Sequence, residues 1–378
     1  MIQPVVFWRL ALIVVSAFLL GGGLTACGTS PKPKPQELVQ VPSLAAKLVW
    51  QTSVGGVAPA QLLTVEQGRV ALTNAKGEVQ VFDLATGRLI WKFDARAPIE
   101  SGAGFDGTRV AVITQANQLL MLQSGRLVWQ VRLPARSYTP PLLAGGRVFV
   151  QLADRSVFAL DGESGGLIWQ LREASDPLVL QQPGLLTHAN NKLLVGQGAR
   201  LLRINPDDGN VEMQSTLAVA RGINDLERLN DLIAPASLTQ TRLCVVAFQT
   251  QLSCVNASTG TLLWSRATTS IVGVSGDATH LVNVQENGVV RLWDVQSNQM
   301  TWDSEVLKFR LLKTPILTPN RVWLADETAV LYSLDRQDGQ LKGRLVTGLG
   351  ALAAGPVVTP KGLLFLSQNG QLRLYEGL

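Results

Sequence analysis

Side chains that could carry catalysis or bind a metal are few and scattered in this sequence. Its two histidines, His188 and His280, lie far apart, and neither forms a pattern with cysteines or carboxylates that is typical of metal ligands. A histidine-based metal centre or catalytic triad is therefore not expected. No glycine-rich phosphate loop occurs, because the glycines fall at turns between short apolar runs. We predict that the protein is not an enzyme and uses no metal or cofactor.

Two of the three cysteines, Cys244 and Cys254, flank a short turn between two predicted strands. If that turn contains two residues, Gln249 and Thr250, the cysteine side chains fall on opposite faces of the hairpin and remain buried free thiols. A three-residue loop would place them on the same face, where an oxidising compartment allows a disulfide. Two buried thiols are our expectation, and the disulfide is the alternative.

The third cysteine, Cys27, ends the most specific local signal in the sequence. The apolar run from Leu10 to Leu20 is shorter than the about 20 residues that span a bilayer, and it fits a secretory signal. Leu24-Thr25-Ala26-Cys27 resembles the bacterial lipobox, in which the cysteine thiol receives diacylglycerol and the chain is cut just before it. The resemblance implies a signal peptide over residues 1–26 and a lipid on Cys27. A signal anchor with an incidental cysteine is the alternative.

Residues 27–46 are predicted to form a tether. They include Pro31-Lys32-Pro33-Lys34-Pro35, and proline-rich segments are semi-extended, at about 3 Å per residue. Gly28 follows the cysteine where inner-membrane lipoproteins of enteric-type bacteria usually carry aspartate. That resemblance implies attachment to the outer membrane, on its periplasmic face, with the folded body of residues 47–378 held away from the lipid.

Composition favours a large all-β body. Hydrophobic residues make up 46% of the 378 residues and charged residues 16%, so a substantial core can form. The 35 glycines and the scarcity of long runs of strong helix formers point to many turns. The net charge of +5 comes from interspersed residues without a basic run, so we do not expect nucleic-acid binding.

One unit recurs along residues 47–378. Full copies run from Val81 to Trp91, from Phe158 to Trp169 and from Leu252 to Trp264, a shortened copy runs from Leu120 to Trp129, and degenerate copies end at Met213, Trp302 and Gly343. Their turn positions are residues 87, 125, 165, 209, 260, 298 and 339. A period of about 40 residues with strand patterning is typical of β-propeller blades.

Each copy reads as strand, tight turn and strand, and two more short apolar runs precede it, so four strands per blade are expected. Leu48-Val49-Trp50 matches a fourth strand without its blade, and Gln371 to Tyr375 matches a third strand without its successor. Joining the two predicts an eighth blade that the N-terminal strand closes, which removes exposed sheet edges. Seven blades are the alternative, because the shortened copy is incomplete. The tryptophans at the repeat position, rather than forming an aromatic ligand platform, are predicted to pack between blades: Trp50, Trp91, Trp129, Trp169, Trp264 and Trp302.

The repeat resembles that of quinoprotein alcohol dehydrogenases, which hold pyrroloquinoline quinone in an eight-bladed ring. Here no two cysteines are adjacent, and no acidic and amide side chains cluster to bind calcium. The lipobox, the proline-rich tether, about eight repeats and the lack of a catalytic set together resemble the BamB family, lipoproteins of the outer-membrane β-barrel assembly machinery. That resemblance implies a non-catalytic scaffold that binds the periplasmic domains of BamA beside other assembly-complex lipoproteins and aids insertion of β-barrel proteins.

Two loops stand out. Gly209 and Gly260 are 51 residues apart, and the extra material lies in residues 220–232, which form either a surface insertion or a partner-binding loop. Residues 227–233 resemble the family segment Asp-Arg-Leu-Ser-Asp-Val-Asp, whose acidic residues contact BamA. The resemblance makes Arg228 and Asp231 partner-binding residues, whereas Ile233 stands where the family has its second aspartate, which leaves that contact open.

The second loop, residues 176–183, is bracketed by prolines and carries an aliphatic triplet. It is either a strand packed on its own blade or an exposed apolar patch. The family loop carries Leu-x-Leu-Arg for BamA binding, so the resemblance assigns Leu178, Leu180 and Gln181 to the interface, with Gln181 in place of the arginine.

We expect basic side chains of the partner to be steered by Asp225, Glu227 and Asp231. Unfolded outer-membrane proteins could pair with exposed blade edges by β-augmentation. A generic propeller lipoprotein that binds peptides or wall polymers is the alternative function, and a quinone-dependent dehydrogenase is the least favoured.

Overall fold

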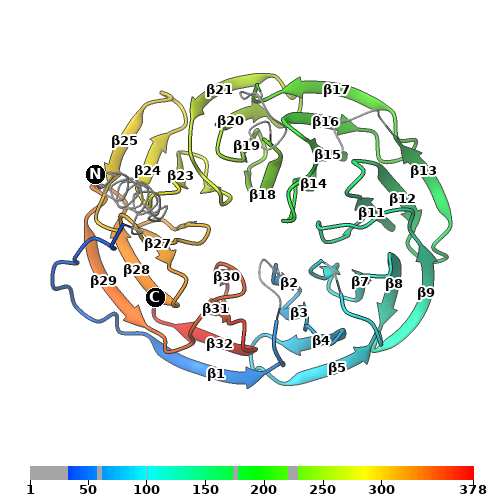
Figure 1. Ribbon diagram of the computed structural model, residues 1–378, viewed down its shortest axis with the longest axis horizontal. Coiled ribbons are helices and arrows are strands. Elements are labelled where there is room, and N and C mark those ends of the chain that lie inside the picture. The colour runs from blue at the N-terminus through cyan, green and yellow to red at the C-terminus, as the bar shows by residue number, and fades with distance from the viewer. Residues whose placement is uncertain (1–32, 58–61, 100, 173–177, 220–228) are drawn as a thin grey trace, which may run out of the picture. The chain divides into compact units, whose positions relative to one another are not determined.

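Each copy of the repeat forms one four-stranded antiparallel sheet, or blade, and eight blades stand around a common axis (Figure 1). The computed structural model describes residues 33–57, 62–99, 101–172, 178–219 and 229–378, so the predicted signal peptide and Cys27 lie outside the described residues. Residues 35–378 form one unit, which contains the whole ring. Every regular element in the described ranges is a strand, and no helix there is long and apolar enough to cross a membrane.

The first four blades follow the chain, and each runs from its innermost to its outermost strand. They comprise β2 (Thr64–Glu66), β3 (Arg69–Thr73), β4 (Glu78–Asp83) and β5 (Leu89–Asp94); β6 (Gly104–Phe105), β7 (Arg109–Ile113), β8 (Gln118–Gln123) and β9 (Arg126–Arg132); β10 (Leu142–Ala144), β11 (Arg147–Gln151), β12 (Val157–Asp161) and β13 (Leu167–Leu171); and β14 (Leu186–Ala189), β15 (Lys192–Gln197), β16 (Arg200–Ile204) and β17 (Val211–Thr216).

Blades 5 to 7 continue in the same order, and blade 8 combines the two ends of the chain. They comprise β18 (Leu232–Leu238), β19 (Arg242–Ala247), β20 (Gln251–Asn256) and β21 (Leu262–Ala267); β22 (Ser275–Gly276), β23 (His280–Val284), β24 (Val290–Asp294) and β25 (Met300–Ser304); β26 (Ile316–Leu317), β27 (Arg321–Ala325), β28 (Val330–Asp335) and β29 (Leu341–Val346); and β30 (Val357–Thr359), β31 (Gly362–Leu366), β32 (Gln371–Glu376) and β1 (Lys47–Ser53).

The predicted eight blades and the N-terminal closure are both confirmed. The shortened copy forms a complete blade, β6 to β9, which excludes the seven-bladed alternative. Strand β1 pairs antiparallel with β32 from Lys47 opposite Glu376 to Ser53 opposite Gln371. The last blade is therefore held together by strands from opposite ends of the sequence.

The turn before each outermost strand explains the repeat. In blade 1 the carboxylate of Asp83 accepts hydrogen bonds from the backbone N–H of Thr86 at 2.8 Å and from its hydroxyl at 2.6 Å. Gly87 follows with a φ of +68°, a conformation that favours glycine. A Cβ at Gly87 would lie 2.5 Å from the indole of Trp50, and the indole N–H donates to the carbonyl of Leu84 at 2.9 Å. Glycine is therefore required here both by the turn conformation and by the contact with the tryptophan of the neighbouring blade 8.

The same indole-on-glycine contact recurs between other blades, which confirms the predicted inter-blade packing there. A Cβ on the turn glycine would lie 2.6–2.7 Å from the indole in three further pairs: Trp129 with Gly165, Trp169 with Gly209 and Trp302 with Gly339. Where the repeat has Met213 instead of tryptophan, the methionine side chain takes the same place against Gly260. One type of contact therefore joins five of the eight pairs of neighbouring blades.

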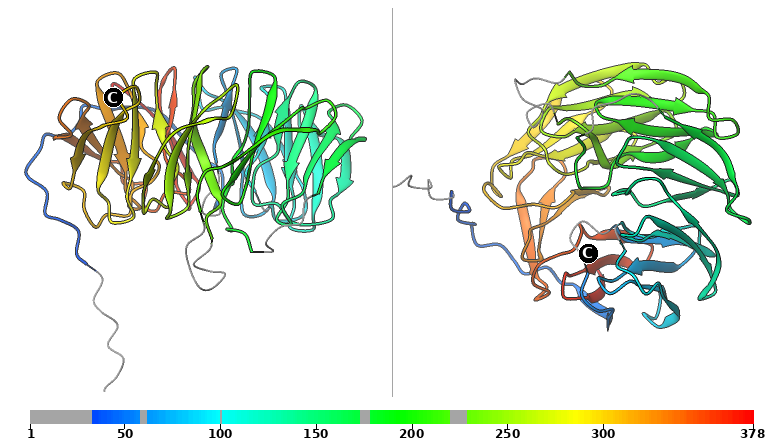
Figure 2. Two further views of the ribbon diagram at one scale, coloured as in Figure 1. Left: turned by 90° about the horizontal axis from the view of Figure 1, so that it is seen from above. Right: turned by 45° about the vertical axis from the view of Figure 1, so that its right-hand side comes forward.

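The two faces of the ring differ in what they carry. Because consecutive strands of a blade are antiparallel, the turns between first and second and between third and fourth strands share one face. The turns between second and third strands and the blade-to-blade connections share the other, which we call the loop face (Figure 2). The described parts of both loops singled out in the sequence, residues 178–183 and 229–231, belong to blade-to-blade connections and therefore lie on the loop face.

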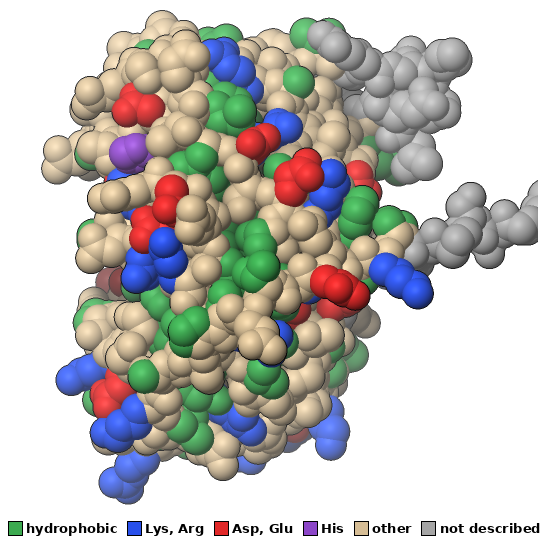
Figure 3. Space-filling model, turned by 90° about the vertical axis from the view of Figure 1, so that its left-hand side faces the viewer, with side chains coloured by type: hydrophobic (Ala, Val, Ile, Leu, Met, Phe, Trp, Pro, Cys, Tyr) green, Lys and Arg blue, Asp and Glu red, His purple; other side chains and the backbone are tan. Residues whose placement is uncertain are grey.

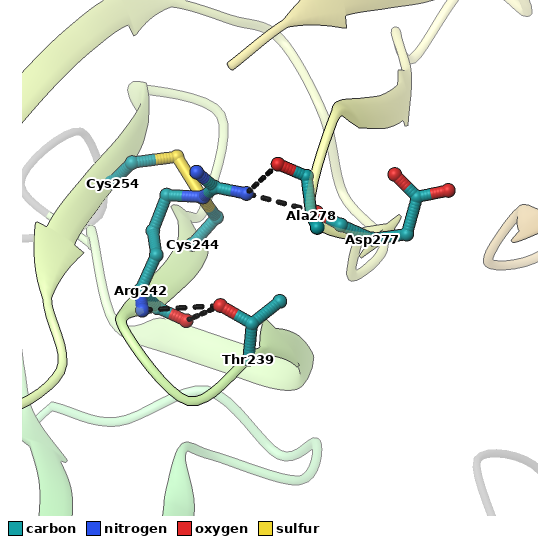
Figure 4. The surroundings of a disulfide bond; sticks show 6 residues. All are labelled: Thr239, Arg242, Cys244, Cys254, Asp277 and Ala278. Carbon is teal, nitrogen blue, oxygen red and sulfur yellow. Dashed lines mark hydrogen bonds between the residues drawn. A yellow bond between two sulfur atoms is a disulfide. The ribbon is translucent and has the colours of Figure 1, made fainter. Parts of the chain in front are cut away.

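Cys244 and Cys254 form a disulfide in blade 5 (Figure 4). Our expectation of two free thiols on opposite faces is wrong, because the hairpin has three residues, Phe248 to Thr250, between the paired Ala247 and Gln251. This length sets Cys244 directly opposite Cys254, with both side chains on one face. Arg242, two residues from the disulfide, donates to the backbone carbonyl of Asp277 at 2.8 Å and so links blade 5 to blade 6.

Replacing both Cys244 and Cys254 with alanine is expected to lower the free energy of unfolding by about 2–4 kcal/mol, because the unfolded chain loses a cross-link. Urea denaturation of the variant and the parent measures the difference. Both cysteines are at most 1% exposed, so dithiothreitol should leave the folded parent unchanged and lower its stability only once the chain has unfolded. Alkylation of both cysteines in the unfolded, unreduced parent would contradict the disulfide.

Charges of both signs alternate on the side of the ring shown in Figure 3. One ion pair joins blades 6 and 7: a guanidinium nitrogen of Arg336 lies 2.6 Å from the carboxylate of Asp277. Burial alone would raise the pKa of Asp277, but hydrogen bonds from Arg336 and from the backbone of His280 and Thr279 outweigh it. Together they hold that pKa well below its usual range.

An Asp277→Asn variant is expected to be less stable than the parent at neutral pH, by up to about 1 kcal/mol for a pair that is partly exposed. The carboxylate has a lower pKa folded than unfolded, so its contribution is fully present above the unfolded pKa near 3.8 and is lost progressively as the pH falls from there through the folded pKa. The difference in melting temperature between the two proteins should therefore be largest at pH 7 and smaller, but still present, at pH 3. Asp338→Asn, at an exposed carboxylate 3.7 Å from Lys342, serves as the control with little effect at either pH.

Candidate partner-binding surface

The connection from blade 3 into blade 4 is joined by backbone hydrogen bonds to β18, the first strand of blade 5. Residues 178–185 lead from blade 3 into blade 4, and residues 229–231 lead into blade 5. The N–H of Leu185 donates to the carbonyl of Leu232 at 2.9 Å, and the N–H of Ala234 donates to that of Pro183 at 3.0 Å. The first connection is thus fixed to blade 5, and it does not form the strand on its own blade that the sequence left open.

A buried ion pair fixes the outer part of the same connection. The guanidinium of Arg155 lies 2.7 Å from one carboxylate oxygen of Asp231, and the side chains are only 9% and 13% exposed. The other carboxylate oxygen accepts the backbone N–H of Leu180 at 2.8 Å. Arg155 also donates to the carbonyl of Leu178 at 2.8 Å. Both ends of the segment from Leu178 to Leu180 are therefore held by one arginine–aspartate pair.

Arg155 reaches this place because its turn is shaped locally and supported by the next blade. It lies between β11 and β12 with a φ of +65°, and the preceding Asp154 accepts the N–H of Ser156 at 3.0 Å. Gln197 of blade 4 donates its side-chain amide to the carbonyl of Arg155 at 2.8 Å. Gly198 follows, where a Cβ would lie 3.3 Å from the guanidinium. Three blades thus contribute to the position of one side chain.

The predicted site residues divide into exposed and buried ones. Leu178 is 39% exposed and Gln181 is also exposed, so both lie on the surface. Leu180 is half-buried and packs on the core cluster that contains Ile233, itself 1% exposed. The structure brings Leu178, Leu180, Gln181 and Asp231 together. Arg228 lies outside the described residues, as do Asp225 and Glu227.

The position of Asp231 differs from the surface carboxylate that the sequence suggested. Its charge is neutralised by Arg155, and both oxygens are engaged within the chain. An aspartate so placed cannot attract a distant partner in the way an exposed one does. Its effect on binding has to pass through the conformation of the Leu178–Leu180 segment.

A cavity behind this segment is small. Its volume is about 40 Å³, and its lining includes Tyr138, Gln151, Leu180 and Gln182. Small-molecule sites usually enclose about 300–1,000 Å³, so this space does not suit a substrate or a cofactor. In the described ranges no three histidine, cysteine or acidic side chains come together to hold a metal. The chemistry available here is that of a surface: an exposed leucine and a polar glutamine on a backbone that is hydrogen-bonded to its surroundings.

The sequence did not single out Arg155. A long cationic side chain in a turn that is otherwise short and polar, Asp154-Arg155-Ser156, is the signal that could have drawn attention to it. Its partner Asp231 is 76 residues away along the chain, on another blade.

Comparisons with known proteins agree with one another. A family model described as outer membrane protein assembly factor BamB matches residues 33–98 and 75–304. A relative of that name from Bordetella pertussis is 31% identical over 374 residues, which cover 97% of this chain and 96% of the relative. Another from Burkholderia pseudomallei is 30% identical over 333 residues, or 87% of each chain.

Solved structures show the same fold. The crystal structure of BamB from Moraxella catarrhalis is similar with a TM-score of 0.79 at 21% identity, covering 88% of this chain and 99% of that one. A quinohemoprotein alcohol dehydrogenase from Comamonas testosteroni is similar with a TM-score of 0.67 at 12% identity, covering 87% and 76%. At such identities the structural likeness concerns the fold alone.

Proposed function

Because the chain belongs to the BamB family of outer membrane protein assembly factors, we propose that it acts in this assembly as a non-catalytic scaffold. The family membership implied by the lipobox, tether and repeats is thereby confirmed. The match over nearly the full length of two relatives supports a shared role more strongly than the shared fold does, since the same ring also occurs in dehydrogenases.

The partner in this proposal is the periplasmic part of BamA, and the surface is the segment from Leu178 to Gln181. The observation that carries it is the Arg155–Asp231 pair, which holds the backbone of the segment that bears the exposed Leu178. A segment with an ordered backbone loses less conformational entropy on binding than a mobile one, so it contributes more affinity. Arg228 belongs to the same proposal through its place in the family motif.

The proposal also covers attachment and further partners. Cys27 carries the lipid that holds the ring at the periplasmic face of the outer membrane, beside the other lipoproteins of the assembly complex. Unfolded outer-membrane proteins pair transiently with the outermost strands. Support for these points comes from the lipobox, from the family and from the exposed aliphatic side chains of outer strands, such as Leu89 in β5 and Leu127 in β9.

A Leu178→Ser variant is expected to recover at least about tenfold less BamA than the parent in a detergent-solubilised pull-down, because it removes the exposed apolar side chain from the proposed interface. A tenfold change corresponds to about 1.4 kcal/mol of binding free energy. Leu262→Ser serves as the matched control, since Leu262 is 49% exposed but lies on the outer strand β21. Equal recovery by all three proteins would leave the assembly role standing and exclude this surface. Recovery of no BamA by the parent would exclude BamA as the direct partner.

A further inference from the structure

The last part of the predicted tether is in contact with the ring. The N–H of Gln36 donates to the carbonyl of Lys308 at 3.0 Å, and Arg310 donates to the carbonyl of Gln36 at 2.7 Å. Further along, the N–H of Leu44 donates to the carbonyl of Arg344 at 2.9 Å. Residues 36–46, which we call the arm, therefore follow blade 7 before β1 begins.

The side chains of the arm alternate with a period of three. Leu38, Val41 and Leu44 are half-buried, whereas the residues between them are exposed. Three residues per turn is the period of a polyproline II helix, the conformation that the neighbouring prolines favour. Leu38 packs on the core cluster of blades 6 and 7, and Leu44 packs on the cluster of blades 7 and 8. A stretch with this pattern has one face suited to packing.

The arm takes the place of a side chain that the repeat omits. Blade 7 has Gly343 where most blades have tryptophan, and Gly343 is buried. A Cβ on Gly343 would lie 2.6 Å from the side chain of Leu44 and 3.2 Å from the carbonyl of Pro42. The three nearest atoms all belong to the arm.

Blade 8 explains why the tryptophan can be absent. Its third and fourth strands come from opposite ends of the chain, so no turn glycine stands there to receive an indole from blade 7. Leu44, Ala46 and Leu378 pack on the same core cluster of blades 7 and 8 instead. The absence of a side chain at Gly343 thus leaves room for the arm to pack on blade 7.

We propose that residues 36–46 are a docked arm whose binding site is the groove at Gly343, and that this docking fixes where the N-terminal segment leaves the ring. Gln36 lies against Lys308 in the connection between blades 6 and 7, which belongs to the loop face. Gln36, the first residue of the arm, thus lies at the same face that carries Leu178. The docking itself stands on contacts alone, and only its consequence for the membrane rests on the proposed function.

Gly343→Trp tests the proposal because it puts the repeat residue where the three atoms nearest to an added Cβ belong to the arm. Met213→Trp is the matched control, since it also puts the repeat tryptophan into a degenerate copy, that of blade 4, which packs on Gly260 instead. Hydrogen exchange of residues 36–46 is followed by mass spectrometry in the full-length protein, in a proteolytic peptide that begins at least two residues before Gln36. Three backbone N–H groups in that range donate hydrogen bonds, those of Gln36, Leu44 and Ala46.

In the parent and in Met213→Trp we expect these amides to exchange at least about tenfold more slowly than in an unstructured peptide. In Gly343→Trp the protection should disappear, while protection of β28 and β29 persists. Fast exchange of the arm in the parent would overturn the proposal, as would full protection in Gly343→Trp. If Gly343→Trp unfolds blade 7, Leu44→Ser replaces it, with the same expected loss confined to the arm. BamA recovery plays no part in this readout, so failure of the proposed function and failure of the docked arm give different results.

Discussion

Replacing Arg155 with methionine is expected to detach the Leu178–Leu180 segment and to reduce BamA recovery at least about tenfold. The variant leaves Asp231 buried without its counter-ion, and breaking a buried ion pair in this way typically costs about 3–5 kcal/mol. The chain can avoid that penalty by opening the segment so that water reaches the carboxylate. Hydrogen exchange of residues 178–185 and the pull-down report the two effects separately.

A double variant shows whether the charge or the contact matters. In Arg155→Met with Asp231→Leu no buried charge is left unpaired, so stability should return toward that of the parent, as replaced buried pairs often do. Binding should return only in part, because the N–H of Leu180 and the carbonyl of Leu178 still lack their partners. Arg132→Met, at an exposed arginine of β9, is the control for removing a cation. Unchanged exchange and binding in the single variant would show that the pair does not position this surface.

Trp169→Ala is expected to lower the free energy of unfolding by about 3–5 kcal/mol, the usual range for removing a buried tryptophan. Trp169 is 8% exposed and packs on Gly209 of the next blade. Leu167→Ala on the same strand should change stability by less than about 0.5 kcal/mol, because Leu167 is 56% exposed. Urea denaturation of the two variants compares inter-blade packing with surface exposure at positions two residues apart.

Phenylalanine variants separate packing from hydrogen bonding. The indole N–H of Trp169 donates to the carbonyl of Pro206 at 2.9 Å, whereas the buried N–H of Trp264 has no protein partner among the described residues. Trp169→Phe should therefore cost about 1 kcal/mol more than Trp264→Phe. An equal cost at both positions would mean that the indole hydrogen bond contributes nothing to the inter-blade contact.

The architecture could be predicted from the sequence because it repeats. A turn such as Asp83 to Gly87 is a local device, and its recurrence at one period reveals the blade without knowledge of any contact. Even the closure could be inferred, since Leu48-Val49-Trp50 is recognisable as a strand without a blade. The hairpin at Cys244 and Cys254 could not be resolved, because two-residue and three-residue turns both suit its polar sequence.

The site was predictable only in part, because its geometry depends on pairs that are distant in sequence. Leu178 and Leu180 could be noticed locally, as an apolar triplet between prolines. The burial of Asp231 could not be predicted, because its environment is supplied by Arg155 from another part of the ring. The docking of the arm could not be predicted for a different reason. The proline-rich composition of the segment predicts a free tether, and Gly343, against which the arm packs, reads in the sequence as an ordinary degenerate copy of the repeat.

The pairing of β1 with β32 has a consequence for how the protein folds. Synthesis proceeds from the N-terminus, so β1 is made long before β32, the strand with which it pairs. Until β32 has been made, Leu48 and Val49 lie on a strand without its neighbour, and an unpaired edge can pair wrongly. Closure is also the contact of greatest sequence separation in the ring, so it is expected to be slow. Before the ring closes, this protein, which belongs to a family of assembly factors, is therefore itself most exposed to incorrect strand pairing.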